Sequence, residues 1–258
     1  MNPPRFFSPF PLAEGTRVEL PEGVARHATR VLRLGAGDDL TLFDGKGGEY
    51  ACRIDFRDRG TAVAEVLSWR DVERESPLGL TLVQALQSGE KMDLTMQKAV
   101  ELGVGHIVPV VSQRSVVRLA GERAKKRVVH WRAVVASACE QCGRNRVPEV
   151  AELEDLRDWL GRPPVGAKPM RLMLDPDASM TLDTCHRPGK AGTVELLIGA
   201  EGGLAPEETD LALLAGFVAV RLGPRVLRTE TAGMAALAAI QCLWGDFAGN
   251  TEAGTNHA

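Results

Sequence analysis

Two loop sequences decide the fold of this chain: Ile198-Gly199-Ala200-Glu201-Gly202-Gly203-Leu204 and Leu222-Gly223-Pro224-Arg225-Val226-Leu227-Arg228-Thr229-Glu230-Thr231-Ala232. Each follows an apolar run typical of a buried strand and precedes a helical pattern. In open α/β sheets, ligands bind at this edge, beyond the carboxyl ends of the strands. Glycines there let backbone groups approach a ligand closely. The loops therefore predict a ligand site, although tight strand-to-helix turns alone would also use these residues.

The sequence around these loops alternates between strand and helix patterns. We expect strands at residues 80–86, 106–112, 170–174, 194–198 and 217–222. We expect helices at 90–102, from about 121 to 142, and starting near Pro206 and Thr229. Apolar runs without alternation are typical of parallel strands in a sheet that helices cover on both faces. The region 80–247 is therefore predicted to be an α/β domain.

Residues 1–73 have a different pattern, with short β-branched runs separated by turn signals at 35–38, 44–48 and 57–60. This spacing predicts a small β-barrel. A charged segment that ends at Pro77 indicates the linker between the two domains, and the small polar residues 248–258 indicate a disordered tail.

One helix is expected to interrupt the barrel, because Pro21 can open a first helical turn. Its apolar residues share one face: Val24, Ala28, Val31 and Leu32. Its basic residues share the other: Arg26, His27, Arg30 and Arg33. The basic face is either merely solubilising or a binding surface.

Charge and composition limit the classes of protein. The net charge of −3 argues weakly against a nucleic-acid partner, but residues 113–146 contain nine Arg or Lys and only two Glu. Because no run of eighteen apolar residues and no signal peptide occurs, we expect a cytoplasmic protein with no membrane segment. Cys139 and Cys142 have CxxC spacing without a second ligand pair, so reduced thiols and no metal site are expected.

A dinucleotide-binding oxidoreductase is disfavoured. Gly199-Ala200-Glu201-Gly202-Gly203 does not match GxGxxG, it lies late in the chain, and no acidic residue ends a strand about twenty residues later. The P-loop pattern is absent as well.

The two loops resemble the cofactor-binding half of the SPOUT methyltransferases, and more narrowly the RsmE family. Three upstream segments agree: Arg30-Val31-Leu32-Arg33-Leu34 with Leu42-Phe43-Asp44-Gly45, Gly89-Glu90-Lys91-Met92 with residues 97–104, and Cys139-Glu140-Gln141-Cys142-Gly143-Arg144-Asn145-Arg146 with residues 147–149. The resemblance covers the chain except its tail. Ala200 departs from the family pattern, which has proline there, and this puts the rigidity of the loop in doubt.

The resemblance implies a function and a partner. The family has an N-terminal PUA-like RNA-binding β-barrel and a SPOUT α/β domain with a trefoil knot. It uses S-adenosylmethionine to methylate N3 of a specific uridine in 16S rRNA of the small ribosomal subunit, and it forms homodimers. A non-catalytic RNA-binding protein with the same fold remains an alternative, but the intact loop at residues 199–203 argues against it.

The resemblance also implies the site residues. Cofactor binding is assigned to Leu174, Ile198, Gly199, Glu201, Gly202, Leu222, Gly223, Val226 and Leu227. Arg228 is the first choice for stabilising the uridine anion and Arg144 the second, while Glu201 would either accept a proton or fix its own loop. RNA binding is assigned to Arg5, Arg26, Arg30, Arg33 and Arg146.

Overall fold

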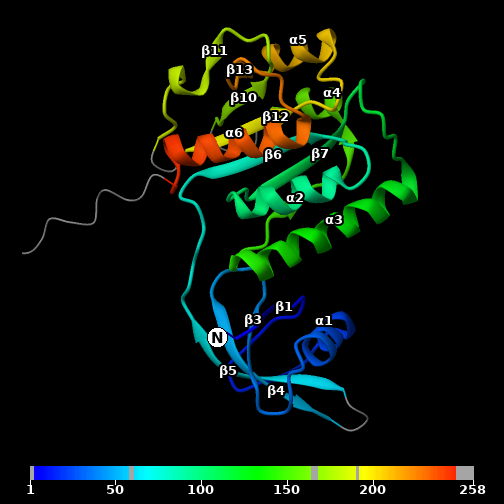
Figure 1. Ribbon diagram of the computed structural model, residues 1–258, viewed down its shortest axis with the longest axis vertical. Helices are drawn as coiled ribbons and strands as arrows, with labels where there is room; N and C mark the ends of the chain where they lie inside the picture. The colour runs from blue at the N-terminus through cyan, green and yellow to red at the C-terminus, as the bar shows by residue number, and fades with distance from the viewer. Residues whose placement is uncertain (1–2, 58–60, 164–167, 190–191, 248–258) are drawn as a thin grey trace, which may run out of the picture. The chain divides into compact units, whose positions relative to one another are not determined.

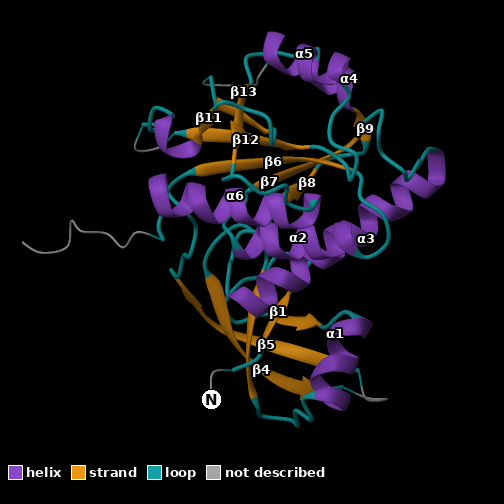
Figure 2. Cartoon of the chain, turned by 45° about the horizontal axis from the view of Figure 1, so that its top comes forward, coloured by secondary structure: helices purple, strands orange, loops and turns teal. Residues whose placement is uncertain are grey.

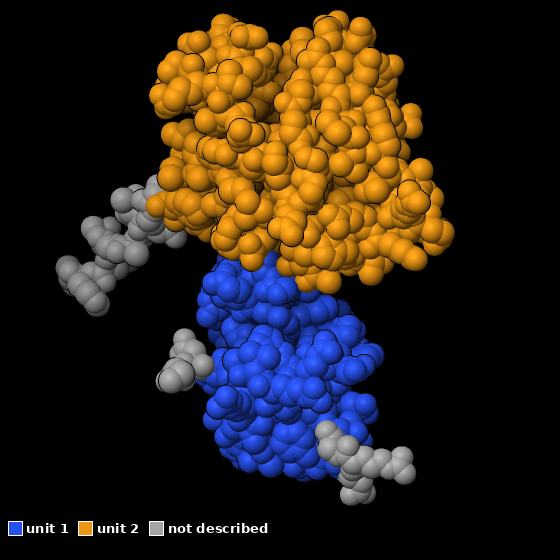
Figure 3. All heavy atoms as spheres, turned by 45° about the vertical axis from the view of Figure 1, so that its right-hand side comes forward, with its two compact units in different colours: residues 1–75, 136–147 blue, residues 76–135, 148–258 orange. Residues whose placement is uncertain are grey.

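The computed structural model describes residues 3–57, 61–163, 168–189 and 192–247, so the predicted tail at 248–258 lies outside the described residues. The chain forms two compact units, which Figure 3 colours separately. The first unit contains residues 1–75 and 136–147, and the second contains residues 76–135 and those from 148 onward. Residues 136–147, which the sequence analysis placed in the α/β domain, thus group with the N-terminal unit.

The first unit is built on a five-stranded sheet with the order β1-β3-β4-β5-β2. Its elements are β1 (Arg5–Phe7), β2 (Arg17–Glu19), α1 (Glu22–Arg26), η1 (His27–Val31), β3 (Asp39–Phe43), β4 (Glu49–Phe56) and β5 (Ala62–Arg70). β1 runs parallel to β3, and the other pairs are antiparallel. The edge strands β1 and β2 leave the sheet open, as a half-barrel.

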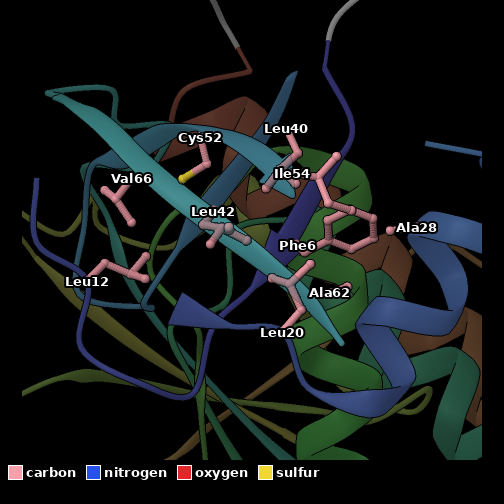
Figure 4. Close-up of a cluster of buried hydrophobic side chains, with 11 residues drawn as sticks. Phe6, Leu12, Leu20, Ala28, Leu40, Leu42, Cys52, Ile54, Ala62 and Val66 are labelled. Atoms are coloured by element: carbon pink, nitrogen blue, oxygen red, sulfur yellow. The ribbon is translucent and has the colours of Figure 1, made fainter. Parts of the chain in front are cut away.

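Alternate residues of these strands fill the core of the first unit (Figure 4). Phe6 of β1, Leu42 of β3, Ile54 of β4 and Val66 of β5 are each at most 2% exposed. Because strand side chains alternate between the two faces, one face of the sheet supplies an apolar layer from short segments.

The helix after Pro21 is confirmed, but its predicted apolar face is wrong in the second half. Ala28 is fully buried, whereas Val31 is 66% exposed and Leu32 is 42% exposed. The cause is the π-helical segment η1, in which the N–H of Leu32 donates to the carbonyl of His27 at 3.0 Å. This i to i+5 bonding widens the turn and rotates later residues away from the face that an α-helix would bury.

The second unit contains an eight-stranded sheet in which every pair is parallel, with the order β11-β13-β10-β12-β6-β7-β8 and β9 beside β7. Its strands are β6 (Gly79–Ala85), β7 (His106–Val111), β8 (Glu149–Val150), β9 (Glu154–Asp155), β10 (Met170–Leu174), β11 (Met180–Thr181), β12 (Thr193–Ile198) and β13 (Val218–Arg221). Its helices are α2 (Lys91–Glu101), α3 (Gly121–Cys142, which ends in the first unit), α4 (Leu156–Leu160), η3 (Leu182–Thr184), α5 (Pro206–Leu214) and α6 (Thr229–Trp244).

Helices cover both faces of this sheet, as predicted. Figures 1 and 2 show α2 and α6 on one side and α4 and α5 on the other. On the α4 and α5 side, Val83, Val108, Met173 and Leu197 from four strands pack into one cluster with Phe217. Within the described residues, no helix is long and apolar enough to cross a membrane.

Candidate functional site

A cavity of about 690 Å³ opens in the second unit at the carboxyl ends of β10, β12 and β13. The loops that follow these strands form most of its wall, at residues 174–177, 198–204 and 222–230. Its size falls in the range of small-molecule and cofactor sites. Both loops singled out from the sequence therefore line one cavity.

The loop after β12 needs glycine at two positions. A Cβ atom on Gly199 would lie 2.8 Å from the carbonyl carbon of Gly203, a distance that real Cβ atoms do not adopt. Gly203 has a φ of +73°, in the left-handed region that favours glycine. The Gly203 N–H donates to the Ala200 carbonyl at 2.8 Å, which closes the turn.

A buried hydroxyl joins this loop to the start of α6. Thr229, the first residue of α6, donates its Oγ1 hydrogen to the Gly199 carbonyl at 2.6 Å. The same oxygen accepts from the side-chain amides of Gln84 and Gln87, each at 3.3 Å. Thr95 of α2 donates to Gln87 Oε1 at 2.9 Å, so the network also reaches that helix. Two cavity loops are thus tied together beneath the surface.

The start of α5 holds the other end of the glycine loop. Pro206 occupies the first turn of α5, as predicted, and the Glu208 carboxylate accepts from the Ala205 N–H at 2.9 Å. Its second oxygen accepts from the Gln113 N–H at 2.6 Å. Glu208 is only 1% exposed. A buried carboxylate with two backbone donors stabilises both segments that meet it.

Glu201 bridges the glycine loop to the segment before α2. Its carboxylate accepts from the N–H of Ser88 at 2.9 Å and from the Ser88 hydroxyl at 2.8 Å. Lys91 Nζ lies 3.8 Å from the same oxygen. Partial burial alone would raise the pKa of Glu201, but the two Ser88 hydrogen bonds and the Lys91 charge outweigh it and lower that pKa below its ordinary value. Glu201 is therefore a weak proton acceptor that is well placed to fix its loop.

The family of the chain follows from its similarity to known proteins. A model of the RNA methyltransferase domain matches residues 74–241, and a model of the RNA methyltransferase PUA domain matches residues 20–67. The ribosomal RNA small subunit methyltransferase E of Buchnera aphidicola subsp. Schizaphis graminum is 33% identical over 244 residues, which cover 95% of this chain and 98% of that protein. This chain belongs to the ribosomal RNA small subunit methyltransferase E family.

Further members of this family agree. The protein of the same name from Mycobacterium bovis is 36% identical over 219 residues, covering 84% of this chain and 83% of that protein. The crystal structure of the Neisseria gonorrhoeae ribosomal RNA small subunit methyltransferase E bound to S-adenosyl methionine is 43% identical, with a TM-score of 0.88 over 95% of this chain and 100% of that one. The predicted family resemblance is confirmed, and with it the α/β methyltransferase domain and the PUA-like N-terminal domain.

The structure gathers the predicted cofactor residues of this family member in the cavity. Its wall contains all nine of them: Leu174, Ile198, Gly199, Glu201, Gly202, Leu222, Gly223, Val226 and Leu227. Arg228 lines the same cavity as an exposed side chain directly before α6. Whether these residues touch a cofactor remains a prediction.

Three charged residues of the cavity escaped the sequence analysis. Lys91 Nζ lies 3.5 Å from a carboxylate oxygen of Glu230, in the first turn of α6. The other Glu230 oxygen is buried and, among the described residues, has no hydrogen-bond partner. Arg114 donates to the Gly202 carbonyl at 2.9 Å. Lys91 lay in the quoted Gly89-Glu90-Lys91-Met92 motif and Glu230 in the second loop, so those motifs were the available signal.

The second candidate cation, Arg144, does not line this cavity. It belongs to the first unit, is 4% exposed, and pairs its guanidinium with both oxygens of Glu75. These contacts favour a structural role. The catalytic assignment of Arg144 stays a prediction without support from the cavity.

The predicted RNA-binding arginines differ in how accessible they are. Arg5 has a 17% exposed side chain that pairs with Glu49, donates to Asn145 Oδ1 at 2.7 Å and lies 5.1 Å from the Phe43 ring centre. Little of its guanidinium is left for a phosphate. Arg146 is 57% exposed and lies 3.4 Å from Glu73. Arg26, Arg30 and Arg33 are all exposed.

The CxxC pair lies on α3, as expected for helix-borne thiols. Burial raises the pKa of the Cys139 thiol to about 12, which keeps it protonated at neutral pH. In the part of the chain that the structure describes, no group of three or more His, Cys, Asp or Glu side chains is arranged to hold a metal ion.

Proposed function

We propose that this chain transfers the methyl group of S-adenosylmethionine to N3 of a uridine in 16S rRNA of the small ribosomal subunit. The observation that carries the proposal is the single cavity in which both predicted loops meet. Relatives that bear the name ribosomal RNA small subunit methyltransferase E support the substrate. A relative with S-adenosyl methionine bound supports the cofactor.

The lining of the cavity fits this cofactor. Leu222, Val226 and Leu227 offer apolar surface for a flat adenine, and Val226 is 82% exposed in the protein alone. Glu230 offers a carboxylate oxygen without a partner among the described residues, and Lys91 offers a cation beside it. Such a pair of opposite charges suits a zwitterionic amino-acid group. Apolar walls with a few polar groups are typical of cofactor sites.

The bound cofactor supplies an activated methyl group, so the protein must bind, orient and stabilise charge. As the uridine N3 proton leaves, negative charge spreads to the base oxygens. The exposed guanidinium of Arg228 at the cavity wall is our choice to stabilise that charge. Glu201, whose pKa is lowered by the Ser88 hydrogen bonds despite partial burial, is assigned to holding the loop in place.

The oligomeric state, topology and location belong to the same proposal. Family membership supports a homodimer, a trefoil knot in the C-terminal domain, and action in the cytoplasm, where ribosomal particles are assembled. Light scattering at working concentration tests the dimer, and a monomer there would contradict it.

One experiment tests the reaction. The protein is incubated with radiolabelled S-adenosylmethionine and small ribosomal subunits that lack the modification, and the labelled nucleotide is mapped by mass spectrometry. We expect one label per particle, on N3 of a uridine in 16S rRNA. No transfer, or transfer to another RNA or another atom, would refute the proposal.

A further inference from the structure

One arginine on the cavity wall has no acidic partner. Arg114 lies in the loop after β7, and its exposed side chain lines the same cavity as the two predicted loops. One of its guanidinium nitrogens donates to the Gly202 carbonyl at 2.9 Å. Within residues 3–57, 61–163, 168–189 and 192–247, this is its only side-chain hydrogen bond, and no carboxylate oxygen lies within 4.0 Å of it. Because a guanidinium has five N–H donors, most of them are free to bind a ligand.

The loop that carries this arginine is held in place on both sides of it. The Ser115 N–H donates to the Ser112 carbonyl at 3.1 Å, and the Ser112 N–H donates to the Ser115 hydroxyl oxygen at 3.1 Å. The Gln113 N–H donates to the buried carboxylate of Glu208 at 2.6 Å. Arg118 donates to the carbonyls of Ser112 and Gln113 at 3.2 and 2.7 Å, so its own donors are used within the loop. A fixed backbone lowers the cost of ordering a side chain when a ligand binds.

The mouth of the cavity has exposed cations on two sides. Arg228 lies in the loop after β13, whereas Arg114 lies in the loop after β7, and the strands β10, β12 and β6 separate β13 from β7 in the sheet. Both side chains are exposed and line the cavity. A molecule that enters the mouth can therefore contact one cation from each side.

We propose that Arg114 binds the 5′-phosphate of the uridine that is methylated, and that its bond to Gly202 fixes this phosphate relative to the cofactor loop. N3 lies on the pairing edge of uracil, so the uridine must be unpaired and turned out of any stack before it can react. Its phosphate remains charged outside the cavity and favours a cation at the mouth. A guanidinium that donates to one carbonyl can still form two parallel hydrogen bonds to phosphate oxygens.

This assignment separates the roles of the two arginines. Arg228 is placed at the base, where charge develops during the reaction, and Arg114 at a phosphate whose charge does not change. A contact of the second kind contributes equally to the bound substrate and to the transition state, so it lowers KM more than it raises kcat. The identity of the nucleotide rests on the proposed function.

A thermodynamic cycle with two small probes tests the contact. Uridine and uridine 5′-monophosphate differ only in the phosphate, and their affinities are measured by NMR titration of the protein saturated with the unreactive product S-adenosylhomocysteine. The wild type should bind the monophosphate about tenfold more tightly than uridine, which is the effect of a hydrogen bond between charged groups. In Arg114→Ala the two affinities should agree within about twofold, because the phosphate has lost its partner.

Arg123→Ala is the matched control. Arg123 is an exposed arginine of α3 in the same unit, and it does not line the cavity. This variant should keep the wild-type preference for the monophosphate. Arg114→Lys keeps the charge but loses the planar fork of donors, so it should keep part of the preference. Calorimetry with S-adenosylmethionine shows that all three variants are folded.

A second measurement uses small ribosomal subunits that lack the modification. In single-turnover assays, Arg114→Ala should raise the subunit concentration that gives half the maximal rate about tenfold, and the maximal rate should fall much less. A loss confined to the maximal rate would contradict a contact with an unreacting phosphate.

The inference is overturned if Arg114→Ala weakens the binding of uridine and of its monophosphate equally, because the arginine would then only hold the Gly202 loop. It is also overturned if inorganic phosphate binds the wild type as tightly as the monophosphate does, or if Arg123→Ala loses the preference as well. Failure of the proposed function is a separate result: the wild type would then prefer the monophosphate through Arg114 yet transfer no methyl group to ribosomal particles.

Discussion

Removal of one buried hydroxyl is expected to disrupt both loops of the cavity. Thr229→Val keeps the shape of the side chain and deletes the oxygen that donates to the Gly199 carbonyl and accepts from Gln84 and Gln87. The Gln84 amide keeps its bond to the Ala85 carbonyl at 3.0 Å. The Gly199 carbonyl and the Gln87 amide nitrogen, in contrast, lose their hydrogen bonds to Thr229 Oγ1.

The expected cost follows from these two groups. A buried polar group left without a partner costs about 1–3 kcal/mol. Two such groups would together cost about 2–6 kcal/mol. Because Gly199 lines the cavity, where water can reach it, we expect a total of about 2 kcal/mol, at the lower end. In a chain of this size each 1 kcal/mol lowers the melting temperature by about 2–4 °C, so a fall of about 4–8 °C is expected.

Thermal unfolding and calorimetry with S-adenosylmethionine check this prediction, and Thr229→Ser is the matched control. Serine keeps the hydroxyl and removes one methyl group, at a cost of about 0.8 kcal/mol. Valine should therefore destabilise more than serine and should also weaken cofactor binding, because the Gly199 carbonyl is no longer held. If valine proves as stable as serine, the hydroxyl network does not hold the loops.

Three further predictions concern the cavity. Arg228→Ala should lower turnover about a hundredfold or more with little change in cofactor and RNA affinity. Arg228→Lys should restore part of the turnover in single-turnover assays. Equal losses in binding and turnover would make Arg228 a positioning residue. Gly202→Val should weaken cofactor binding in a folded protein, because its Cβ position lies 3.3 Å from Arg114 Cβ, and unchanged calorimetric affinity would remove this loop from the site. Glu201→Gln should be less stable than the wild type at neutral pH. Because the pKa of Glu201 is lowered in the folded protein, the difference in stability should shrink as the pH falls below about 4.5. A difference that persists in acid denaturation would refute the role of the Glu201 charge.

Long apolar runs made most of the second unit predictable. The strands at 170–174 and 194–198 lie where the pattern placed them, because burial on both faces of a parallel sheet leaves a nearly unbroken hydrophobic signal. The helix from 121 to 142 lies where its helical pattern placed it. The nine predicted cofactor residues could also be identified, because they lie at the ends of strands or in the loops that follow them. Two-residue strands such as β8 and β11 carry too few side chains to form a pattern.

The arginines show where sequence reasoning stops. The sequence analysis assigned Arg144 to catalysis and Arg5 to RNA binding, but these arginines pair with Glu75 and Glu49. The partners lie 69 and 44 residues away in the sequence, so no local pattern reveals them. The π-helical segment η1 was equally hidden, because a shift of the backbone hydrogen bonds by one residue leaves no signal in the residue types. That shift decides whether Val31 is buried or exposed.

The division of α3 between the two units has a consequence for how the protein folds during its synthesis. The helix is continuous from residue 121 to residue 142, yet the first unit takes only its end, from residue 136, together with the loop to residue 147. Asn145, which is fully buried, accepts from Arg5, and Glu140 accepts from the Phe7 N–H at 2.9 Å. The N-terminal unit therefore cannot complete its fold when residue 75 is synthesised. The contacts of β1 with Glu140 and Asn145 form only after the sixty residues 76–135, which begin the other unit, have been translated. The order of synthesis therefore differs from the order of folding in this chain.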